Sequence, residues 1–416
     1  KVNRITGGIV ASLLAVALLL SIGAGAGWAQ FANQPIIALE VAGNSHVPSD
    51  NILAISGLKI GDLATDQALG QAAKNIANMG FFVPRSVIPG LLPIEGGVKV
   101  IFNVVEYPVV SAIKFIGNAH VSAADLESQM ETKIGQVLNE AALRQDQDNI
   151  QVFYQSKGYI ALITGAPVDP ETGVITIELV EVSVREIKIE GNRRTKSDVV
   201  LRELTTKPGQ VLNTKSVQED LRTLRNLDLF EEVSARYDPI LTEDGLADPD
   251  QIGFVDFVVV VKDKRTGNLG LGIGYSPRDG IVGFVSVSEQ NLWGRGQQGK
   301  VYVEQGGRQS YDLYFKEPWF DKNKTSLSVS VYDRVSDRDL YYTDVSDEQE
   351  SYEEQRRGFT LGATRPVGKN RSMGLTYKLE EVERSGDIID DEYLFEPLGK
   401  TSTISMSYLE DSRDFY

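Results

Sequence analysis

The sequence GNSHV at residues 43–47 recurs as GNAHV at 117–121 and, more weakly, as GNRRT at 191–195. Each copy begins 74 residues after the previous one. The pairs that open these copies are Gly43-Asn44, Gly117-Asn118 and Gly191-Asn192. A single glycine recurs with the same 74-residue spacing, at Gly61, Gly135 and Gly209. Self-similarity at a fixed period indicates a repeated structural unit, so the sequence predicts three copies of one unit.

Each copy has the same predicted order of elements, β-α-α-β-β. A strand of alternating apolar residues ends at the Gly-Asn turn, and a short helix follows, with N-cap candidates at Ser49, Ser122 and 195–197. Longer amphipathic helices are predicted over 65–79, 139–157 and 213–227. Two strands close each unit, as at 158–163 and 174–182 in the second. We expect two helices on one face of a three-stranded mixed sheet, whose edge strand is free to pair with an extended segment.

The last third of the chain has a different pattern. Leu269, Leu271, Ile273 and Tyr275 alternate with Gly270, Gly272 and Gly274. Similar alternation predicts eight strands, at 268–275, 281–290, 299–305, 309–316, 325–334, 356–364, 371–382 and 401–410. Strands of about ten residues with one apolar face and one small or polar face are typical of a transmembrane β-barrel. A soluble β-sandwich also alternates and is the competing interpretation.

Connection lengths favour the barrel over the sandwich. The connections at 291–298, 317–324 and 365–370 are short and fall on one side of the sheet. The two long connections, at 335–355 and 383–400, fall on the other side. Short turns on the periplasmic side and longer loops outside are the rule for outer-membrane barrels.

The N-terminus has the order of a secretory signal. Lys1 and Arg4 precede an apolar run at 9–20, and small residues continue to Ala29. The apolar run is shorter than the roughly 20 residues needed to span a bilayer, so we expect a cleaved signal peptide. The predicted domains are a signal at 1–29, three repeats at 35–107, 108–182 and 183–264, and a barrel segment at 267–416.

Composition excludes several function classes. Lys and Arg number 42 against 58 Asp and Glu, a net charge of −16, which argues against nucleic acid as a partner. Cysteine is absent and only two histidines occur, so thiolate zinc sites, cysteine nucleophiles and histidine-rich metal sites are not expected. The stretch 270–274 reads G-x-G-x-G, but no helix follows it to receive a phosphate. We therefore expect no enzyme activity, no catalytic residues, no cofactor and no metal.

Several motifs resemble those of the outer-membrane protein insertase superfamily, and within it the outer-membrane protein assembly factors. The repeats resemble POTRA domains, and residues 191–203, GNRRTKSDVVLRE, look like the POTRA motif adjacent to the barrel. The barrel motif Asn291-Leu292-Trp293-Gly294-Arg295-Gly296 is similar to the family's Asn-Leu-Phe-Gly-x-Gly segment. Residues 315–320 and 411–414 also resemble family segments. Well-studied members have five POTRA units, whereas this chain shows three. The family barrel has sixteen strands, so the resemblance implies that this sequence is truncated at its C-terminus.

The resemblance implies assembly and insertion of β-barrel proteins into the outer membrane. POTRA edges would hold the client by β-augmentation, and the strand at 269–275 would template it at a lateral seam of the barrel. The three glycines of that strand either loosen the seam or make room in the lumen. The implied partners are unfolded barrel clients, periplasmic chaperones, accessory lipoproteins and outer-membrane lipid, with the repeats in the periplasm. A translocation and assembly module protein or a two-partner secretion transporter of the same superfamily is the alternative.

Overall fold

The computed structural model describes residues 33–242, 244–277, 280–307, 309–340, 350–368, 370–385 and 399–411. The predicted signal at 1–29 lies outside these residues. The chain divides into two compact units. The first contains the first two repeats and residues 249–253, and the second contains the third repeat and the C-terminal strands. Within the described ranges, every helix is too short or too polar to cross a membrane.

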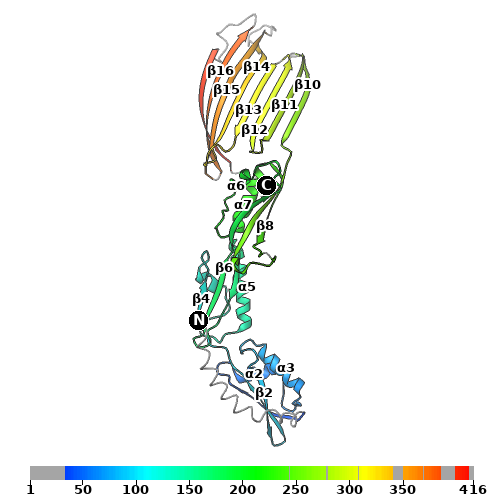
Figure 1. Ribbon diagram of the computed structural model, residues 1–416, viewed down its shortest axis with the longest axis vertical. Helices are drawn as coiled ribbons and strands as arrows, with labels where there is room; N and C mark the ends of the chain where they lie inside the picture. The colour runs from blue at the N-terminus through cyan, green and yellow to red at the C-terminus, as the bar shows by residue number, and fades with distance from the viewer. Residues whose placement is uncertain are drawn as a thin grey trace, which may run out of the picture. The chain divides into compact units, whose positions relative to one another are not determined.

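All three repeats have the predicted β-α-α-β-β order, and each forms a three-stranded mixed sheet (Figure 1). In each sheet the third strand of the repeat lies in the middle, parallel to the first and antiparallel to the second. The first repeat consists of β1 (Ile36–Ala42), α2 (Ser49–Ser56), α3 (Asp66–Ala77), β2 (Ile88–Ile94) and β3 (Gly97–Asn103). The second consists of β4 (Ala112–Ile116), α4 (Ala123–Ser128), α5 (Glu140–Lys157), β5 (Ala161–Gly165) and β6 (Val174–Glu181). The third consists of β7 (Ser183–Glu190), α6 (Ser197–Leu201), α7 (Thr214–Asn226), β8 (Phe230–Pro239), η2 (Pro249–Gln251) and β9 (Phe254–Asp263).

The helix starts agree with the sequence at some positions and not at others. Ser122 caps α4, because its hydroxyl accepts a hydrogen bond from the backbone N–H of Asp125. Ser49 is not a cap: Pro48 occupies the N-cap position of α2, and the Ser49 hydroxyl accepts a bond from Asn44 instead. In the stretch 195–197 the N-cap is Lys196, whose side chain makes no capping bond. The side-chain amide of Asn44 therefore bonds to the Ser49 hydroxyl, which the sequence alone predicts to cap the helix.

The strand predicted at 158–163 begins later, at Ala161. Gly158 is the C-cap of α5, with a left-handed φ of 93°, so it ends the helix instead of starting the strand. The backbone N–H of Gly158 donates to carbonyls of the last helical turn.

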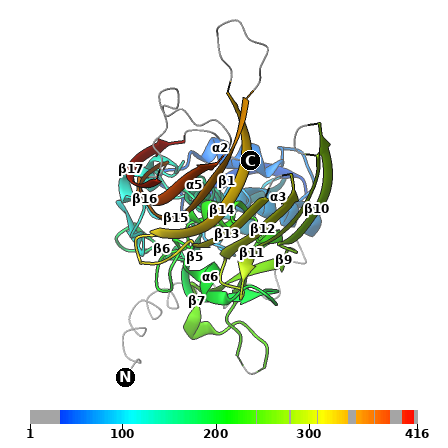
Figure 2. The same ribbon diagram turned by 90° about the horizontal axis from the view of Figure 1, so that it is seen from above.

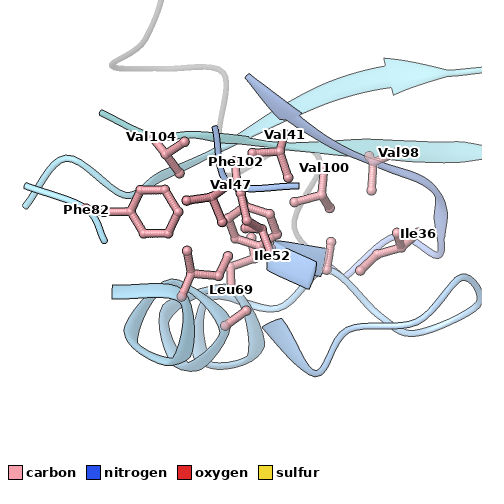
Figure 3. Packing of buried hydrophobic residues seen from close by; sticks show 13 residues of the cluster. Ile36, Val41, Val47, Ile52, Leu69, Phe82, Val98, Val100, Phe102 and Val104 are labelled. Carbon is pink, nitrogen blue, oxygen red and sulfur yellow. The ribbon is translucent and has the colours of Figure 1, made fainter. Parts of the chain in front are cut away.

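Apolar side chains from the helices and one face of the sheet form the core of each repeat. In the first repeat, Ile52 of α2 and Leu69 of α3 meet Val100 and Phe102 of β3, and all four are buried (Figure 3). Phe82 packs against the same cluster. Burying one such side chain is worth about 1.5–3 kcal/mol, so this cluster is the main source of the repeat's stability.

The C-terminal strands form one antiparallel sheet of eight strands in sequence order (Figures 1 and 2). They are β10 (Gly267–Ser276), β11 (Gly280–Leu292), β12 (Gln297–Gly306), β13 (Gln309–Glu317), β14 (Ser326–Leu340), β15 (Glu350–Gly368), β16 (Arg371–Ser385) and β17 (Gly399–Glu410). β10 and β17 are its two edges, and no pairing joins them among the residues described. This confirms the eight predicted strands. Among the residues described, these strands pair only with one another.

Two of these strands are longer than predicted. β14 and β15 continue through most of the connection expected at 335–355, with pairs from Asp337↔Glu353 to Leu340↔Glu350. The backbone hydrogen bonds of an antiparallel pair do not depend on side-chain polarity, so an in-register hairpin extends beyond its apolar segment. The predicted connection was therefore too long at both ends, and its central residues, 341–349, lie outside the described residues.

Candidate functional site

The Gly-Asn turn is a structural element of every repeat. The turn glycines Gly43, Gly117 and Gly191 have left-handed φ values of 85–96°. A Cβ on any of them would lie 1.9–2.1 Å from a carbonyl oxygen in, or directly after, the last strand of the repeat, so only glycine fits. The side-chain amides of the turn asparagines each donate to the carbonyl three residues later, at 2.8–3.0 Å. The turn therefore ends the first strand and directs the chain into the first helix.

A carboxylate from the end of the middle strand secures each turn. Glu106 accepts backbone N–H bonds from Ser45, His46 and Val47 at 2.9–3.1 Å, and the His46 ring nitrogen Nδ1 lies 3.1 Å from it. Burial alone would raise the pKa of Glu106, but these donors outweigh it and hold the pKa below its usual value. In the second repeat, His120 contacts Glu181 at 2.6 Å in the same way.

In the third repeat Asp263 takes this place. It accepts a bond from the backbone N–H of Arg194 and another from the Thr195 hydroxyl, both at 2.6 Å. The sequence reasoning identified the turns but missed all three carboxylates, Glu106, Glu181 and Asp263. Their only sequence signal is an acidic residue at or just after the end of the last strand of each repeat.

The third turn also contacts the barrel motif at 291–296. The backbone N–H of Lys196 donates to the carbonyl of Gly294 at 2.9 Å. The Asn291 amide donates to the Thr195 hydroxyl, also at 2.9 Å, while that hydroxyl donates to Asp263. These contacts join two motifs that are about 100 residues apart in sequence. We call residues 191–197 and 291–296 together the repeat–sheet joint.

Within the barrel motif, the residues have different roles. Asn291 closes its own turn, because its Oδ1 accepts the backbone N–H of Gly296 at 2.8 Å. Gly294 has φ 72°, and a Cβ there would lie 2.1 Å from the Arg194 carbonyl oxygen. Trp293 also has a positive φ, but the residue is 72% exposed.

A second set of contacts, the Trp319 clamp, reinforces the joint. Trp319 lies in the connection between β13 and β14. The Arg202 guanidinium and the Lys324 ammonium each lie 5.1 Å from its ring centroid. Lys324 also donates to the buried carboxylate of Glu203 at 3.0 Å, and Arg202 donates to the carbonyl of Arg295 at 3.2 Å. A cavity of about 140 Å³ lies among these side chains.

The predicted seam strand is β10. It pairs with β11 along its whole length, from Gly267↔Glu289 to Ser276↔Gly280, and has no partner on its other side among the described residues. Its apolar side chains are strongly exposed, Ile273 by 86%. Exposed apolar residues continue this face across the sheet: Val287, Val301, Leu313, Val331, Leu361, Leu375 and Ile404. The glycines lie on the opposite face, as the alternation predicts.

The edges of the repeat sheets differ in their backbone donors. β2 is an edge strand with exposed Ile88, Leu92 and Ile94, but its two prolines, Pro89 and Pro93, remove backbone N–H groups. β8 is also an edge strand, and proline occurs in it only at its last residue. Pairing with an added strand needs a regular row of N–H and C=O groups, so β8 is better suited to it than β2.

Comparisons with known proteins support the family resemblance. A model described as the Omp85 superfamily domain matches residues 291–416. The POTRA model, described as surface antigen variable number repeat, matches residues 108–181 and 182–264.

Curated relatives are about one quarter identical to this chain over the segments that align. The chloroplastic outer envelope protein 80 of Oryza sativa subsp. japonica is 25% identical over 62% of this chain and 39% of its own length. The outer membrane protein assembly factor BamA of Nitratidesulfovibrio vulgaris is 28% identical over 51% of this chain and 24% of its own. The chain thus spans well under half the length of these relatives. The solved N-terminal domain of Omp85 from Thermosynechococcus elongatus is 28% identical, covering 56% of this chain and 98% of that one, with a TM-score of 0.47.

Proposed function

Because the chain belongs to the Omp85 superfamily, as a BamA-type member with POTRA repeats, we propose that it assembles and inserts β-barrel proteins into an outer membrane. The observation that carries the proposal is the exposed apolar face of the eight-stranded antiparallel sheet, whose first strand is β10. The apolar face of the eight-stranded sheet contacts lipid, and the repeats lie in the periplasm.

The seam acts through backbone pairing. An unfolded strand cannot enter hydrocarbon with unpaired N–H and C=O groups, since each costs several kcal/mol there. When the seam opens, the edge of β10 that faces away from β11 supplies such partners. A client strand that pairs with β10 enters the membrane with the backbone N–H and C=O groups of one edge already hydrogen-bonded. The neighbouring strand of its own hairpin then pairs with the groups of its other edge. No covalent reaction and no cofactor is needed for this step.

The repeats hold the client before insertion. Their edge strands bind extended segments by β-augmentation, and β8 of the third repeat is better suited to this than β2 because proline occurs in it only at its last residue. Periplasmic chaperones deliver the clients, and accessory lipoproteins assist at the repeats. The repeat–sheet joint then fixes the third repeat to the sheet that carries the seam.

Single cysteines test the seam directly, because the chain has none of its own. Leu269→Cys places a thiol on β10, and Leu313→Cys places one on β13, in the interior of the sheet; both side chains are exposed on the apolar face. A barrel client arrested during insertion carries one cysteine in its last strand. We expect a disulfide adduct with the protein carrying Leu269→Cys and none with Leu313→Cys.

Equal adducts at the two positions, or none at either in an insertion-competent protein, would refute the seam. Adducts of a secreted passenger in place of a barrel client would favour the translocation members of the superfamily. The readout is a mass shift on a non-reducing gel, and the protein is used in its full length.

A further inference from the structure

The glycine face of β10 has one close contact with its neighbour. Gly272 and Phe284 are directly opposite in the β10–β11 pair. A Cβ at position 272 would lie only 2.2 Å from Cε1 of the Phe284 ring. The ring therefore occupies the space that any larger residue at position 272 would need.

The other two glycines of the strand lack such a contact. A Cβ at Gly270 would have its nearest neighbour at 3.6 Å, and one at Gly274 at 4.0 Å, which are ordinary van der Waals distances. Of the three positions, only at 272 does an aromatic ring occupy the space that a side chain would take. The three glycines are not equivalent, although the sequence gives them the same G-x-G-x-G setting.

The contact continues into the interior of the sheet. The Phe284 ring stacks on Tyr302 of β12, with centroids 5.8 Å apart and planes at 26°. The Tyr302 hydroxyl donates to Glu304, and the Lys300 ammonium lies 5.8 Å from the Tyr302 ring. One aromatic pair therefore connects the edge strand, through Gly272, to the third strand of the sheet.

We propose that Phe284 is a positioning residue that braces the seam strand, keeping β10 attached to β11 while its other edge is open. The proposal rests on the function proposed above. Glycine weakens a strand and leaves its face without side-chain contacts, so β10 is the strand that most needs such a brace. If β10 separated from β11 when a client paired with it, the client would lose its template. Because the Phe284 contact holds β10 to β11, the sheet opens at the other edge of β10, where the client strand pairs.

The sheet contains a second aromatic-on-glycine contact away from the seam. Tyr332 of β14 lies over Gly358 of β15, where a Cβ would be 2.8 Å from the tyrosine hydroxyl. That hydroxyl donates to Glu380 of β16 at 2.7 Å. Because β15 is paired on both sides, this contact supplies a matched control: removing it disturbs a similar brace without touching the edge strand.

The test is hydrogen–deuterium exchange of the β10 amides in the full-length protein in lipid, without client, for Phe284→Ala and Tyr332→Ala. We expect exchange in β10 to rise about threefold to tenfold in Phe284→Ala, the size expected for one lost aromatic contact. We expect Tyr332→Ala to leave β10 unchanged while exchange in β14–β16 rises. Client insertion, measured on the same samples, falls in Phe284→Ala and falls less in Tyr332→Ala.

A second set of variants separates the brace from general damage to the strand. Gly272→Ala displaces the ring and raises exchange, whereas Gly274→Ala has space for its methyl group and does not. In the Phe284→Ala background, Gly272→Ala adds little, because the clash is gone. Unchanged β10 exchange in Phe284→Ala overturns the proposal, and so does raised exchange with normal insertion. Failure of the wild-type protein to insert any client would instead refute the proposed function, and the exchange data distinguish the two cases.

Discussion

Replacing Gly294 with alanine should open the repeat–sheet joint. The new Cβ would lie 2.1 Å from the Arg194 carbonyl oxygen; the backbone fixes the position of the Cβ, and the oxygen is itself a backbone atom, so neither can rotate away. The two segments must separate by about 1 Å to reach normal contact. The two cross-joint bonds, Lys196 to Gly294 and Asn291 to Thr195, are each 2.9 Å long and would break.

The size of the effect follows from these contacts. Placing an L-residue at a left-handed φ costs about 1 kcal/mol or more. Each lost hydrogen bond costs about 1 kcal/mol. Gly209→Ala is the matched control, because Gly209 has φ 82° but nothing within 4 Å of its Cβ. The two variants share the backbone cost, so Gly294→Ala should weaken the joint by about 2 kcal/mol more, or about 30-fold.

Spin labels measure the opening. Gln218 on α7 and Lys322 in the β13–β14 connection are both exposed, and residues 1–416 contain no cysteine that would compete with labels at Gln218→Cys and Lys322→Cys. We expect one narrow distance distribution in the parent and in Gly209→Ala, and a broad one in Gly294→Ala. A narrow, unshifted distribution in Gly294→Ala would refute the reasoning.

Three further predictions concern the turns and the clamp. The pKa of Glu106 is lowered in the folded state, so the stability that this carboxylate contributes is present above its ordinary pKa of 4.5 and is lost as pH falls through the lowered value. Glu106→Gln should therefore flatten the pH dependence of hydrogen exchange in the first repeat. An unchanged pH profile in Glu106→Gln would contradict this prediction. Gly117→Ala should destabilise the second repeat by roughly 2 kcal/mol or more, whereas Gly135→Ala, with open space at its Cβ, should cost only its backbone strain; equal losses in thermal unfolding would count against the turn clash. Trp319→Ala should broaden the same label distances through a loss of about 1–2 kcal/mol of cation–π contact, while Trp293→Ala should leave them unchanged.

The repeats and strands were predictable because their signals are local. The apolar alternation around Gly43, Gly117 and Gly191 and the amphipathic helices after them depend on neighbours a few residues away. The same holds for the eight strands after residue 267. Two local predictions were wrong because a neighbouring residue or element took the expected role. The hydroxyl of Ser49 bonds to a turn asparagine instead of capping its helix, and Gly158 ends a helix instead of starting a strand. The site residues beyond the turns could not be predicted in the same way.

By itself, the sequence determined the repeated β-α-α-β-β unit, the Gly-Asn turns and the single-faced strands, because periodicity and glycine chemistry act over short spans of chain. Only the tertiary structure decided which of these residues act together. The joint brings 191–197 against 291–296, and Asp263 meets the third turn across its sheet. Gly272 differs from its two neighbouring glycines because register places Phe284 opposite it. Such roles depend on pairing across the sheet, which strand periodicity alone does not specify.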